Sequence, residues 1–408
     1  MRPAPGASLY CPYCYEQFTE REIMFRCTGR TSRRQRNCAP EIDEVLRERT
    51  GFRGALPPVF AADGRMSSAV CPRCGDVSTT KICPVCHSQL PVQFGKVRSR
   101  LIALAGAPES GKTVFLTVLV HELMHRIGEQ FNAAISGADD STLLRFADDY
   151  EQPLYRDARL LASTRTSGVP IVFRFTTAGN GPFSPDGRLG RLARRGRLGG
   201  GDPQHTLLSF FDTAGEDLRS RQSMEHNVRY LAAADGIVLL LDPLQMRGAR
   251  GLAAPGTRLP NPARPENQPA PVLQKITDLL LAKGGISPGD RIGKPLAITF
   301  SKMDTLLGGL KQTSPLLRPA PQAPYFDDRD SLAVHTEIQR LLARWEGSQI
   351  DQIAQLHYRC YRYCGVSALG ETPTADNRVS PRGIRPVRVA DPFLWILAEL
   401  GAVAMRRA

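Results

Sequence analysis

From about residue 96 onward, short apolar runs alternate with amphipathic helical stretches. This alternation is typical of an α/β domain whose sheet is largely parallel. The apolar runs predict strands, and the amphipathic stretches predict helices. The strands are expected at Ser99–Ala105, Pro170–Thr176, Thr206–Phe211, Gly236–Leu241, Leu296–Phe300 and Tyr361–Val366, and the helices at Lys112–Arg126, Ser141–Tyr150, Val272–Ala282, Ser331–Trp345 and Pro392–Leu400.

Two of these strands, Pro170–Thr176 and Thr206–Phe211, have no helical pattern between them, so they are expected to form the one antiparallel hairpin. Stretches rich in glycine, proline or arginine predict long loop insertions at about residues 179–205, 243–271 and 306–330. Residues 1–95 carry few long apolar runs and hold eight cysteines. The sequence therefore predicts a small N-terminal region, residues 1–95, followed by an α/β domain, residues 96–408.

The chain has 408 residues and a formal net charge of +13. Of its 53 basic residues, 8 are lysines and 45 are arginines, and alanine, glycine and proline are rich as well. This composition is typical of a GC-rich genome, so nucleic-acid binding is left as an alternative that the charge alone does not favour. The most apolar run, Gly236–Leu241, is far shorter than the ~20 residues of a membrane-spanning helix. No secretory leader pattern opens the chain, and a cytoplasmic location is expected.

A phosphate-binding pattern, G-x-x-x-x-G-K-T, is matched in full by Gly106–Thr113. The segment follows an apolar strand and opens a helix, which is the context that the motif requires. Glycines let backbone N–H groups approach phosphates, and the helix N-terminus favours negative charge. Lys112 is expected to reach the β- and γ-phosphates, and the Thr113 hydroxyl to ligate Mg²⁺. The predicted contacts are Gly106, Ala107, Pro108, Glu109, Ser110, Gly111, Lys112 and Thr113.

Three further motifs follow predicted strands. Asp212 is expected to hold Mg²⁺, usually through water, and the Gly215 N–H to sense a γ-phosphate. Asp304, at the end of Ser-Lys-Met-Asp, can accept two hydrogen bonds from a guanine edge, which adenine cannot supply. The Lys302 stem is expected to cover the base, while Ser301 stands where Asn or Thr is usual. Backbone N–H groups of Ser367, Ala368 and Leu369 are expected to meet the base oxygen.

The order and spacing of these motifs resemble the translation-factor and Ras-like class of GTPases. The resemblance implies a Mg²⁺-sensing threonine before the Pro170 strand, with Thr166 slightly preferred over Thr164. It also places Glu216 where many such GTPases carry the glutamine that orients water. Glutamate could act as a base there or repel the γ-phosphate, so fast intrinsic hydrolysis is not expected. The implied catalytic set is Lys112, Thr166, Gly215 and Glu216, and the implied Mg²⁺ ligands are Thr113, Asp212 and Thr166.

The N-terminal cysteines, six of them in three Cys-x-x-Cys pairs, predict zinc rather than disulfides. Four thiolates suit a closed tetrahedral zinc site, which supports folding rather than catalysis. The compact array is assigned one zinc and the looser array a second, and a cross-braced pairing between them stays open. The compact array is Cys71, Cys74, Cys83 and Cys86, and the looser one is Cys11, Cys14, Cys27 and Cys38.

Cysteine pairs and nucleotide motifs in this order resemble the bacterial double-GTPase family, second type. The residues that carry the resemblance are Cys11-Pro-Tyr-Cys14, Cys83-Pro-Val-Cys86-His87, the phosphate loop, Ser-Phe-Phe-Asp212-Thr-Ala-Gly-Glu and Phe-Ser-Lys-Met-Asp304. The family includes actinobacterial proteins with zinc ribbons. The resemblance implies a GTP-hydrolysing switch that uses Mg²⁺ and structural zinc. It also implies a partner, either a second GTPase or an effector, in a bacterial conflict or defence system.

Several alternatives stay open. Ser301 leaves room for an ATP-binding P-loop enzyme, and Glu216 for a hydrolysis-poor nucleotide-binding scaffold. A zinc-ribbon nucleic-acid-binding module with an accessory NTPase would show binding that falls steeply with salt. The segment His121–His125 also matches the zinc-protease pattern H-E-x-x-H. It lies in the helix after the phosphate loop, with no obvious third ligand, and is expected to pack or face solvent.

Overall fold

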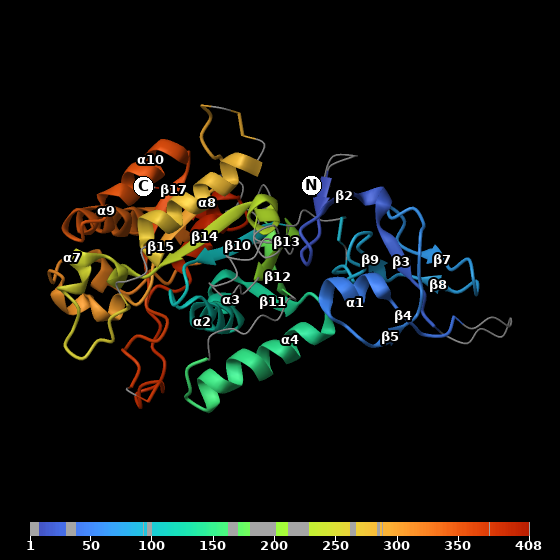
Figure 1. Ribbon diagram of the computed structural model, residues 1–408, viewed down its shortest axis with the longest axis horizontal. Helices are drawn as coiled ribbons and strands as arrows, with labels where there is room; N and C mark the ends of the chain where they lie inside the picture. Colours follow the sequence, from blue (N-terminus) through green and yellow to red (C-terminus); the bar gives the residue numbers. More distant parts are fainter. Residues whose placement is uncertain are drawn as a thin grey trace, which may run out of the picture.

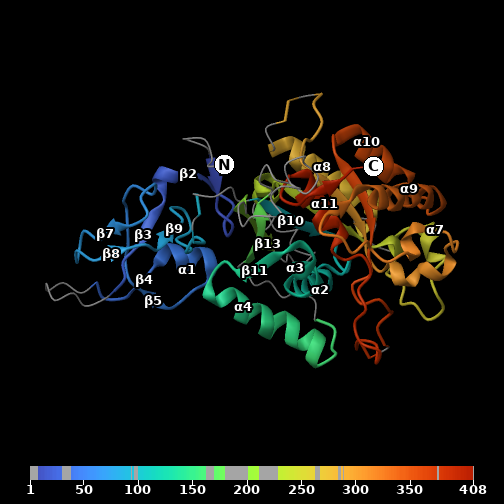
Figure 2. The same cartoon turned by 180° about the vertical axis from the view of Figure 1, so that it is seen from behind.

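The computed structural model describes residues 8–29, 38–92, 94–95, 100–161, 170–179, 201–210, 228–261, 267–283, 286–287, 289–374 and 376–407. The N-terminal residues lie at one end of the molecule and the C-terminal helices at the other, as Figure 1 shows. The opposite view in Figure 2 gives the same arrangement.

The centre of the molecule is a seven-stranded sheet. Its strands are β10 (Leu101–Gly106), β11 (Ala133–Gly137), β12 (Ile171–Gly179), β13 (Gly201–Phe210), β14 (Gly236–Leu241), β15 (Leu296–Phe300) and β17 (Tyr361–Gly365). Their spatial order is β11-β12-β13-β10-β14-β15-β17. The neighbours from β13 to β17 pair in parallel, whereas β12 is antiparallel to both β11 and β13. The predicted mostly parallel α/β fold is confirmed, and so is the predicted hairpin.

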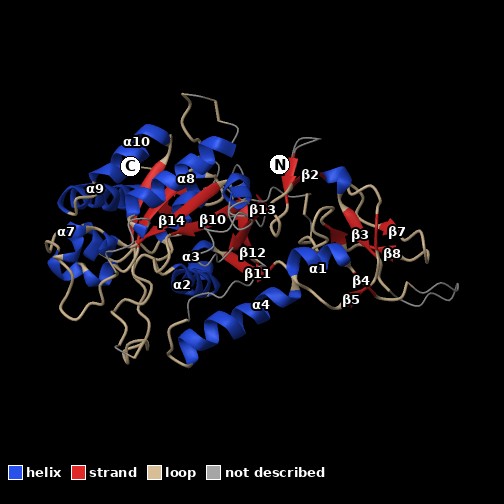
Figure 3. Cartoon of the chain, viewed as in Figure 1, coloured by secondary structure: helices blue, strands red, loops and turns tan. Residues whose placement is uncertain are grey.

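Both faces of the sheet are buried. Because successive side chains of a strand point to opposite faces, each strand contributes to two cores. On β14, Ile237, Leu239 and Leu241 pack into one core, and Val238 and Leu240 into the other. The helices Pro269–Lys283, Asp328–Arg344 and Ser348–His357 cover the first face, and the helices Lys112–Met124 and Asp391–Glu399 cover the second. The sheet thus forms the middle layer of three, visible in Figure 3.

The helices of this part are short or moderate in length. They are α2 (Lys112–Met124), α3 (Arg126–Phe131), α4 (Asp140–Phe146), a π-helical continuation (Ala147–Arg156), α7 (Arg247–Arg250), α8 (Pro269–Lys283), α9 (Asp328–Arg344), α10 (Ser348–His357) and α11 (Asp391–Glu399). Residues 228–233 are helical as well. Single 3₁₀ turns are η4 (Pro243–Gln245), η6 (Met303–Thr305), η7 (Leu307–Gly309) and η8 (Pro315–Leu317), and β16 (Phe326–Asp327) pairs with β18 (Met405–Arg406).

The structure differs from the sequence-based expectation around β11. The expected helix Lys112–Arg126 ends at Met124, and α3 follows directly. Asn132, at φ 47°, then turns the chain in the left-handed region into β11. This strand pairs antiparallel with β12, a second antiparallel pairing that the sequence did not predict. The pattern missed β11 because its five residues carry a single large apolar side chain, Ile135.

The three expected loops are also more ordered than predicted. The 243–271 stretch contains η4, α7 and the first turn of α8, and the 306–330 stretch contains η7, η8, β16 and the start of α9. Strand β13 begins at Gly201, inside the first expected loop, of which residues 180–200 lie outside the described part. Among the described residues, no helix is both long and apolar enough to cross a membrane.

The N-terminal region is built from short strands and one helix. Its elements are β1 (Ser8–Tyr10), β2 (Gln17–Thr19), the 3₁₀ turn η1 (Glu20–Glu22), β3 (Met24–Arg26), β4 (Glu41–Ile42), α1 (Glu44–Thr50), β5 (Ala55–Leu56), β6 (Val59–Phe60), β7 (Ala69–Val70), β8 (Val77–Ser78) and β9 (Lys81–Ile82). The central strand, β3, pairs antiparallel with β6 on one side and β9 on the other. Strands this short supply little apolar core, so such a region needs additional cross-links.

Candidate nucleotide site

The loop between β10 and α2 has a backbone that only glycine permits at two positions. A Cβ on Gly106 would lie 2.3 Å from the carbonyl oxygen of Leu240 on β14. Gly111 caps α2 with φ +83°, in the left-handed region that side chains disfavour. The loop therefore lies tightly against the sheet, and α2 begins directly after Gly111.

Lys112 lies over this loop rather than in solvent. Its Nζ donates hydrogen bonds to the carbonyl oxygens of Gly106, at 3.1 Å, and Ala107, at 2.8 Å. The Ser110 hydroxyl donates to the same Ala107 oxygen at 2.8 Å and is fully buried. Thr113 follows in the first turn of α2. The ammonium group is thus held at the loop, where a phosphate chain would lie.

Lys302 connects the predicted base-reading motif to the phosphate loop. Its backbone has φ 53°, and its Nζ donates to the carbonyl oxygen of Glu109 at 2.9 Å. The same Nζ forms an ion pair at 2.7 Å with the buried carboxylate of Asp242. The other oxygen of Asp242 accepts from the Leu244 N–H at 2.9 Å. Lys302 therefore has a fixed direction, and Asp242 is the residue that sets it.

Asp242 was missed by the sequence analysis. The signal was present, because the apolar run Gly236–Leu241 ends in this carboxylate just as the Leu296–Phe300 run ends in Ser301. Carboxyl ends of parallel neighbours meet at one edge of a sheet, and β14 and β15 are parallel neighbours.

Asp304 and Ser367, predicted from separate motifs, are in direct contact. The Ser367 hydroxyl donates to Asp304 Oδ1 at 2.5 Å and accepts from the Gly370 N–H at 2.9 Å. Burial raises the pKa of Asp304, although the hydrogen bond from Ser367 opposes the shift. The Met303 N–H also donates to the carbonyl oxygen of Val366, at 3.1 Å. The ends of β15 and β17 are thereby joined, and Ala368 and Leu369 follow Ser367 directly in the chain.

Ser301 has a structural role at this edge. Its hydroxyl donates to the carbonyl oxygen of Leu241 at 3.2 Å, which ties the end of β15 to β14. Five predicted residues lie outside the described part of the chain: Thr164, Thr166, Asp212, Gly215 and Glu216. Their predicted roles stay predictions.

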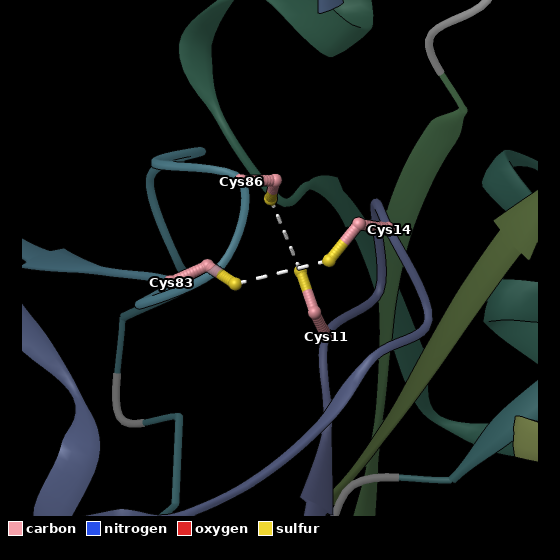
Figure 4. Close-up of side chains that lie close together, drawn as sticks. All are labelled: Cys11, Cys14, Cys83 and Cys86. Carbon is pink, nitrogen blue, oxygen red and sulfur yellow. Dashed lines mark hydrogen bonds between the residues drawn. The ribbon is translucent and has the colours of Figure 1, made fainter. Parts of the chain in front are cut away.

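The eight N-terminal cysteines form two tetrads, but not the two that were predicted. The first cluster is Cys11, Cys14, Cys83 and Cys86, and the second cluster is Cys27, Cys38, Cys71 and Cys74. Figure 4 shows the first cluster, with two cysteines from each of two loops and the four sulfurs turned toward one another. The predicted assignment by sequence proximity was wrong, and the cross-braced alternative describes the arrangement.

Strand pairing explains the exchange. Strands β3 and β9 run antiparallel, with Met24 opposite Ile82 and Phe25 opposite Lys81. Cys27 follows β3 and Cys83 follows β9, so the antiparallel pairing sends these two cysteines to opposite ends. The short spacing between Cys74 and Cys83 predicted that both bind the same zinc. In the structure they belong to different clusters, with β9 between them in the chain.

Three of the Cys-x-x-Cys segments form the same tight turn. Tyr15, Gly75 and His87 each follow the second cysteine with a positive φ, of 62°, 79° and 56°. Each donates its N–H back to the carbonyl oxygen of the first cysteine, at 2.9 to 3.1 Å. The turns at Cys11 and Cys83 also direct a backbone N–H at the first sulfur, at 3.4 Å. Such turns orient thiolates and stabilise their charge.

The sulfur geometry fits zinc. The paired sulfurs lie 3.7 and 3.9 Å apart in the first cluster and 3.5 and 3.7 Å in the second. Tetrahedral zinc with Zn–S bonds of about 2.3 Å separates its sulfurs by roughly 3.8 Å. Burial raises the pKa of Cys11, while hydrogen bonds from Cys11, Cys14 and Cys83 lower that of Cys86. Four buried thiolates repel one another unless a cation joins them.

His87, a competing candidate ligand, is engaged elsewhere. Its Nδ1 lies 2.8 Å from Asp43 Oδ1, and the other oxygen of Asp43 accepts from Arg26 at 2.8 Å. Asp43 also caps α1 through the Leu46 N–H. Although burial raises the pKa of Asp43, the Leu46 N–H, Arg26 and His87 together lower it below its usual value. Cys86 therefore completes the first cluster.

The H-E-x-x-H segment is spread over α2 and its end. His121 Nδ1 lies 2.7 Å from Glu151, and His125 Nδ1 lies 2.8 Å from the His121 carbonyl oxygen. Glu122 pairs with Arg126. Among the described residues, the potential metal-binding groups of three or more side chains are the two cysteine clusters. Within that part of the chain, His121 and His125 therefore have no third ligand with which to form a protease zinc site.

Comparisons with known proteins give one curated relative of note. The chain is 29% identical over 369 residues to a protein of Mycolicibacterium smegmatis named "Putative ESX-1 scaffolding and assembly protein SaeC". The aligned part covers 86% of each chain. No family model matches the chain.

Solved structures with some similarity include small GTPases and G domains. The Arl6 small GTPase of Trypanosoma brucei is 12% identical, with 75% of this chain and 98% of that chain covered and a TM-score of 0.30. The signal recognition particle receptor complex SRb-GTP/SRX of Chaetomium thermophilum is 15% identical, with 71% and 95% covered and a TM-score of 0.28. The FeoB G domain of T. maritima is 11% identical, with 67% and 91% covered and a TM-score of 0.24.

Proposed function

We propose that this protein is a Mg²⁺-dependent GTP-binding switch. The observation that carries the proposal is the contact of Ser367 with Asp304 beside Lys302, whose ammonium group touches the phosphate loop. These contacts support one nucleotide site in which the phosphate end adjoins the base end. The proposed role of each side chain follows from its chemistry.

At the phosphate end, the loop from Gly106 to Thr113 would enclose the β- and γ-phosphates. Lys112 would exchange its two carbonyl partners for phosphate oxygens, which are stronger acceptors for an ammonium group. The Thr113 hydroxyl would supply a Mg²⁺ ligand, together with Asp212 and Thr166. Bound Mg²⁺ would neutralise charge between the β- and γ-phosphates.

At the base end, the Asp304 carboxylate would accept hydrogen bonds from the N1–H and the exocyclic amine of guanine. Ser367 holds one carboxylate oxygen, and Lys302 is held in place by Asp242. Adenine presents no such pair of donors, so it would leave a buried carboxylate without a hydrogen bond from the base. The preference for guanine is therefore a consequence of burial as well as of geometry.

Hydrolysis by this switch is proposed to be slow. Glu216 stands where many similar GTPases carry the glutamine that orients water. Its carboxylate would lie near the γ-phosphate in addition to that of Asp212, and the added negative charge there is unfavourable. A slow switch suits a protein that assembles other proteins. The mycolicibacterial relative, named for ESX-1 scaffolding and assembly, supports such a role for this chain, with a protein partner that senses the bound nucleotide. The conflict-system role stays a hypothesis.

The N-terminal region is proposed to hold two structural zinc ions, one in each cluster. Closed tetrads leave no position for substrate, so zinc there would stabilise the fold. Residues 1–95 and 96–408 are proposed as the two domains.

A change of base specificity tests the function directly. Asn at position 304 would present an amide, whose N–H₂ suits the C2 carbonyl of xanthine and not the C2 amine of guanine. We expect Asp304→Asn to lower the affinity for a non-hydrolysable GTP analogue about a hundredfold, ~2.7 kcal/mol, and to raise that for the xanthosine analogue. Asp278→Asn, an exposed aspartate on α8, is the matched control. Equal loss of both nucleotides, or no loss, would contradict the assignment of Asp304.

A further inference from the structure

The first cysteine cluster lies directly against the nucleotide-binding sheet. Cys11, Cys14, Cys83 and Cys86 share a hydrophobic core with Val172 on β12 and Leu207 on β13. Core residues of the second cluster, such as Phe25 and Phe60, all belong to the N-terminal region. The two clusters therefore differ in what they contact, although they are chemically alike.

The turn that follows Cys11 makes a specific polar contact with β13. The fully buried Ser209 hydroxyl donates to the Pro12 carbonyl oxygen at 2.7 Å. Tyr15 Oη lies 2.8 Å from Ser209 Oγ and, since that hydroxyl proton is already used, Tyr15 is the donor. Tyr15 is itself buried, and its backbone has the left-handed conformation that ends the turn.

The contact continues from β13 to the strand of the phosphate loop. Tyr230 packs against Tyr15, with ring centroids 4.9 Å apart. Its hydroxyl donates to the Ser209 carbonyl oxygen at 2.9 Å and accepts from the Leu104 N–H at 2.7 Å. Leu104 lies on β10, two residues before Gly106. A chain of buried hydrogen bonds thus joins the Cys11 turn to β13 and to the phosphate-loop strand.

Two further contacts of the same turn do not reach the phosphate-loop strand. The Tyr13 hydroxyl donates to Asp139 at 2.8 Å, in the connection between β11 and α4. Arg229, next to Tyr230, forms an ion pair with Glu16. The cluster packs against β12 and β13, and in sequence Thr166 precedes β12 and Asp212 follows β13. A change in the position of β12 or β13 would therefore alter the packing around the cluster.

We propose that the first cysteine cluster is energetically coupled to the nucleotide site through Tyr15, Ser209 and Tyr230. Metal in this cluster fixes the Cys11 turn, and the turn holds β13 against the phosphate-loop strand. Nucleotide affinity then depends on zinc in the first cluster, and nucleotide in return raises the zinc affinity of that cluster, because coupling between two sites is reciprocal. Zinc in the second cluster has no such effect. This inference rests on the proposed nucleotide-binding function.

The test uses the full chain and two readouts, nucleotide affinity and zinc affinity, the latter by competition with a chromogenic chelator. On a Cys74→Ser background, which removes the second cluster, a non-hydrolysable GTP analogue with Mg²⁺ should raise zinc affinity about tenfold, within the ~5- to 150-fold range of typical couplings. Tyr15→Phe keeps the ring and removes the hydroxyl. It should leave zinc content unchanged, weaken nucleotide binding by roughly tenfold, and abolish the effect of nucleotide on zinc affinity.

Tyr13→Phe is the matched control, since it removes a hydroxyl from the same turn that contacts Asp139 instead of β13. It should resemble the unmodified protein in both readouts. If the protein binds the GTP analogue but zinc affinity does not change, or if Tyr15→Phe and Tyr13→Phe behave alike, the coupling is overturned and the switch function stands. If the unmodified, zinc-loaded protein binds no guanine nucleotide, both proposals fall.

Discussion

Ser367 donates a 2.5 Å hydrogen bond to Asp304 and so joins the loops that follow β17 and β15. The two residues are 63 positions apart in the chain. Their contact depends on the parallel pairing of β15 with β17, which brings both loops to the same edge of the sheet. A carboxylate fixed in this way has one orientation toward a bound base.

Loss of the Ser367 hydroxyl should weaken guanine recognition. A hydrogen bond to a charged group contributes about 1.5–3 kcal/mol, so Ser367→Ala is expected to lower the affinity for a GTP analogue by about tenfold or more. Calorimetric titration measures the effect. Ser348→Ala, at an exposed position in α10, is the control and should bind normally. Unchanged affinity in Ser367→Ala would show that Asp304 needs no such support.

Guanine binding should weaken as pH falls. Burial raises the pKa of Asp304 above its ordinary value of 3.8, so the carboxylate is protonated while exposed carboxylates are still charged. The protonated group loses one acceptor, and affinity for the GTP analogue falls as pH decreases through this raised pKa.

The stability of the free protein should show the opposite sign. Between the ordinary and the raised pKa of Asp304, the folded protein keeps a proton that the unfolded chain releases. The contribution of this group to the free energy of unfolding therefore falls as pH rises through that window. Asp304→Asn should remove both dependences. An affinity that is flat with pH in the unmodified protein would argue against a buried carboxylate as the base-reading group.

Lys112→Ala should abolish nucleotide binding. The ammonium group provides the positive charge at the phosphate loop, and we expect a loss of about a hundredfold or more, ~2.7 kcal/mol. Lys311→Ala removes a charge at an exposed position outside the loop and serves as the control. Retained affinity and turnover in Lys112→Ala would refute the phosphate-loop assignment.

Pairs of cysteine substitutions should reveal how the zinc ligands are combined. The structure predicts that Cys11→Ser with Cys83→Ser removes one zinc, because both residues belong to the first cluster. Cys11→Ser with Cys27→Ser should remove both, because these residues belong to different clusters. Native mass spectrometry counts the bound metal. The reverse result would restore the pairing by sequence proximity, and a folded protein without metal would refute zinc binding altogether.

Much of the fold could be predicted from the sequence. Strands such as Gly236–Leu241 are buried on both faces and are apolar throughout, so their pattern is unambiguous. Strand β11 and helix α10 escaped notice. The first has one large apolar residue, and the second buries only Ile350, Ile353 and Ala354 among polar neighbours.

The candidate site was predictable where a motif is continuous in the chain, as in Gly106–Thr113. The site was less predictable where the pairing of distant segments determines which residues meet. Cysteine spacing gave the number of clusters but not their members, because the antiparallel pairing of β3 with β9 exchanges the partners. Asp242 and Ser209 were missed, since their partners, Lys302 and Tyr15, come from distant segments.

The most direct test of the central claim is a calorimetric comparison of GTP and ATP affinity, with Mg²⁺ and non-hydrolysable analogues. The account predicts that the GTP analogue binds tighter by about a hundredfold or more, a difference of ~2.7 kcal/mol, because Asp304 reads the guanine edge. Equal or tighter binding of the ATP analogue would contradict the account and leave the Ser301–Asp304 segment with a structural role alone.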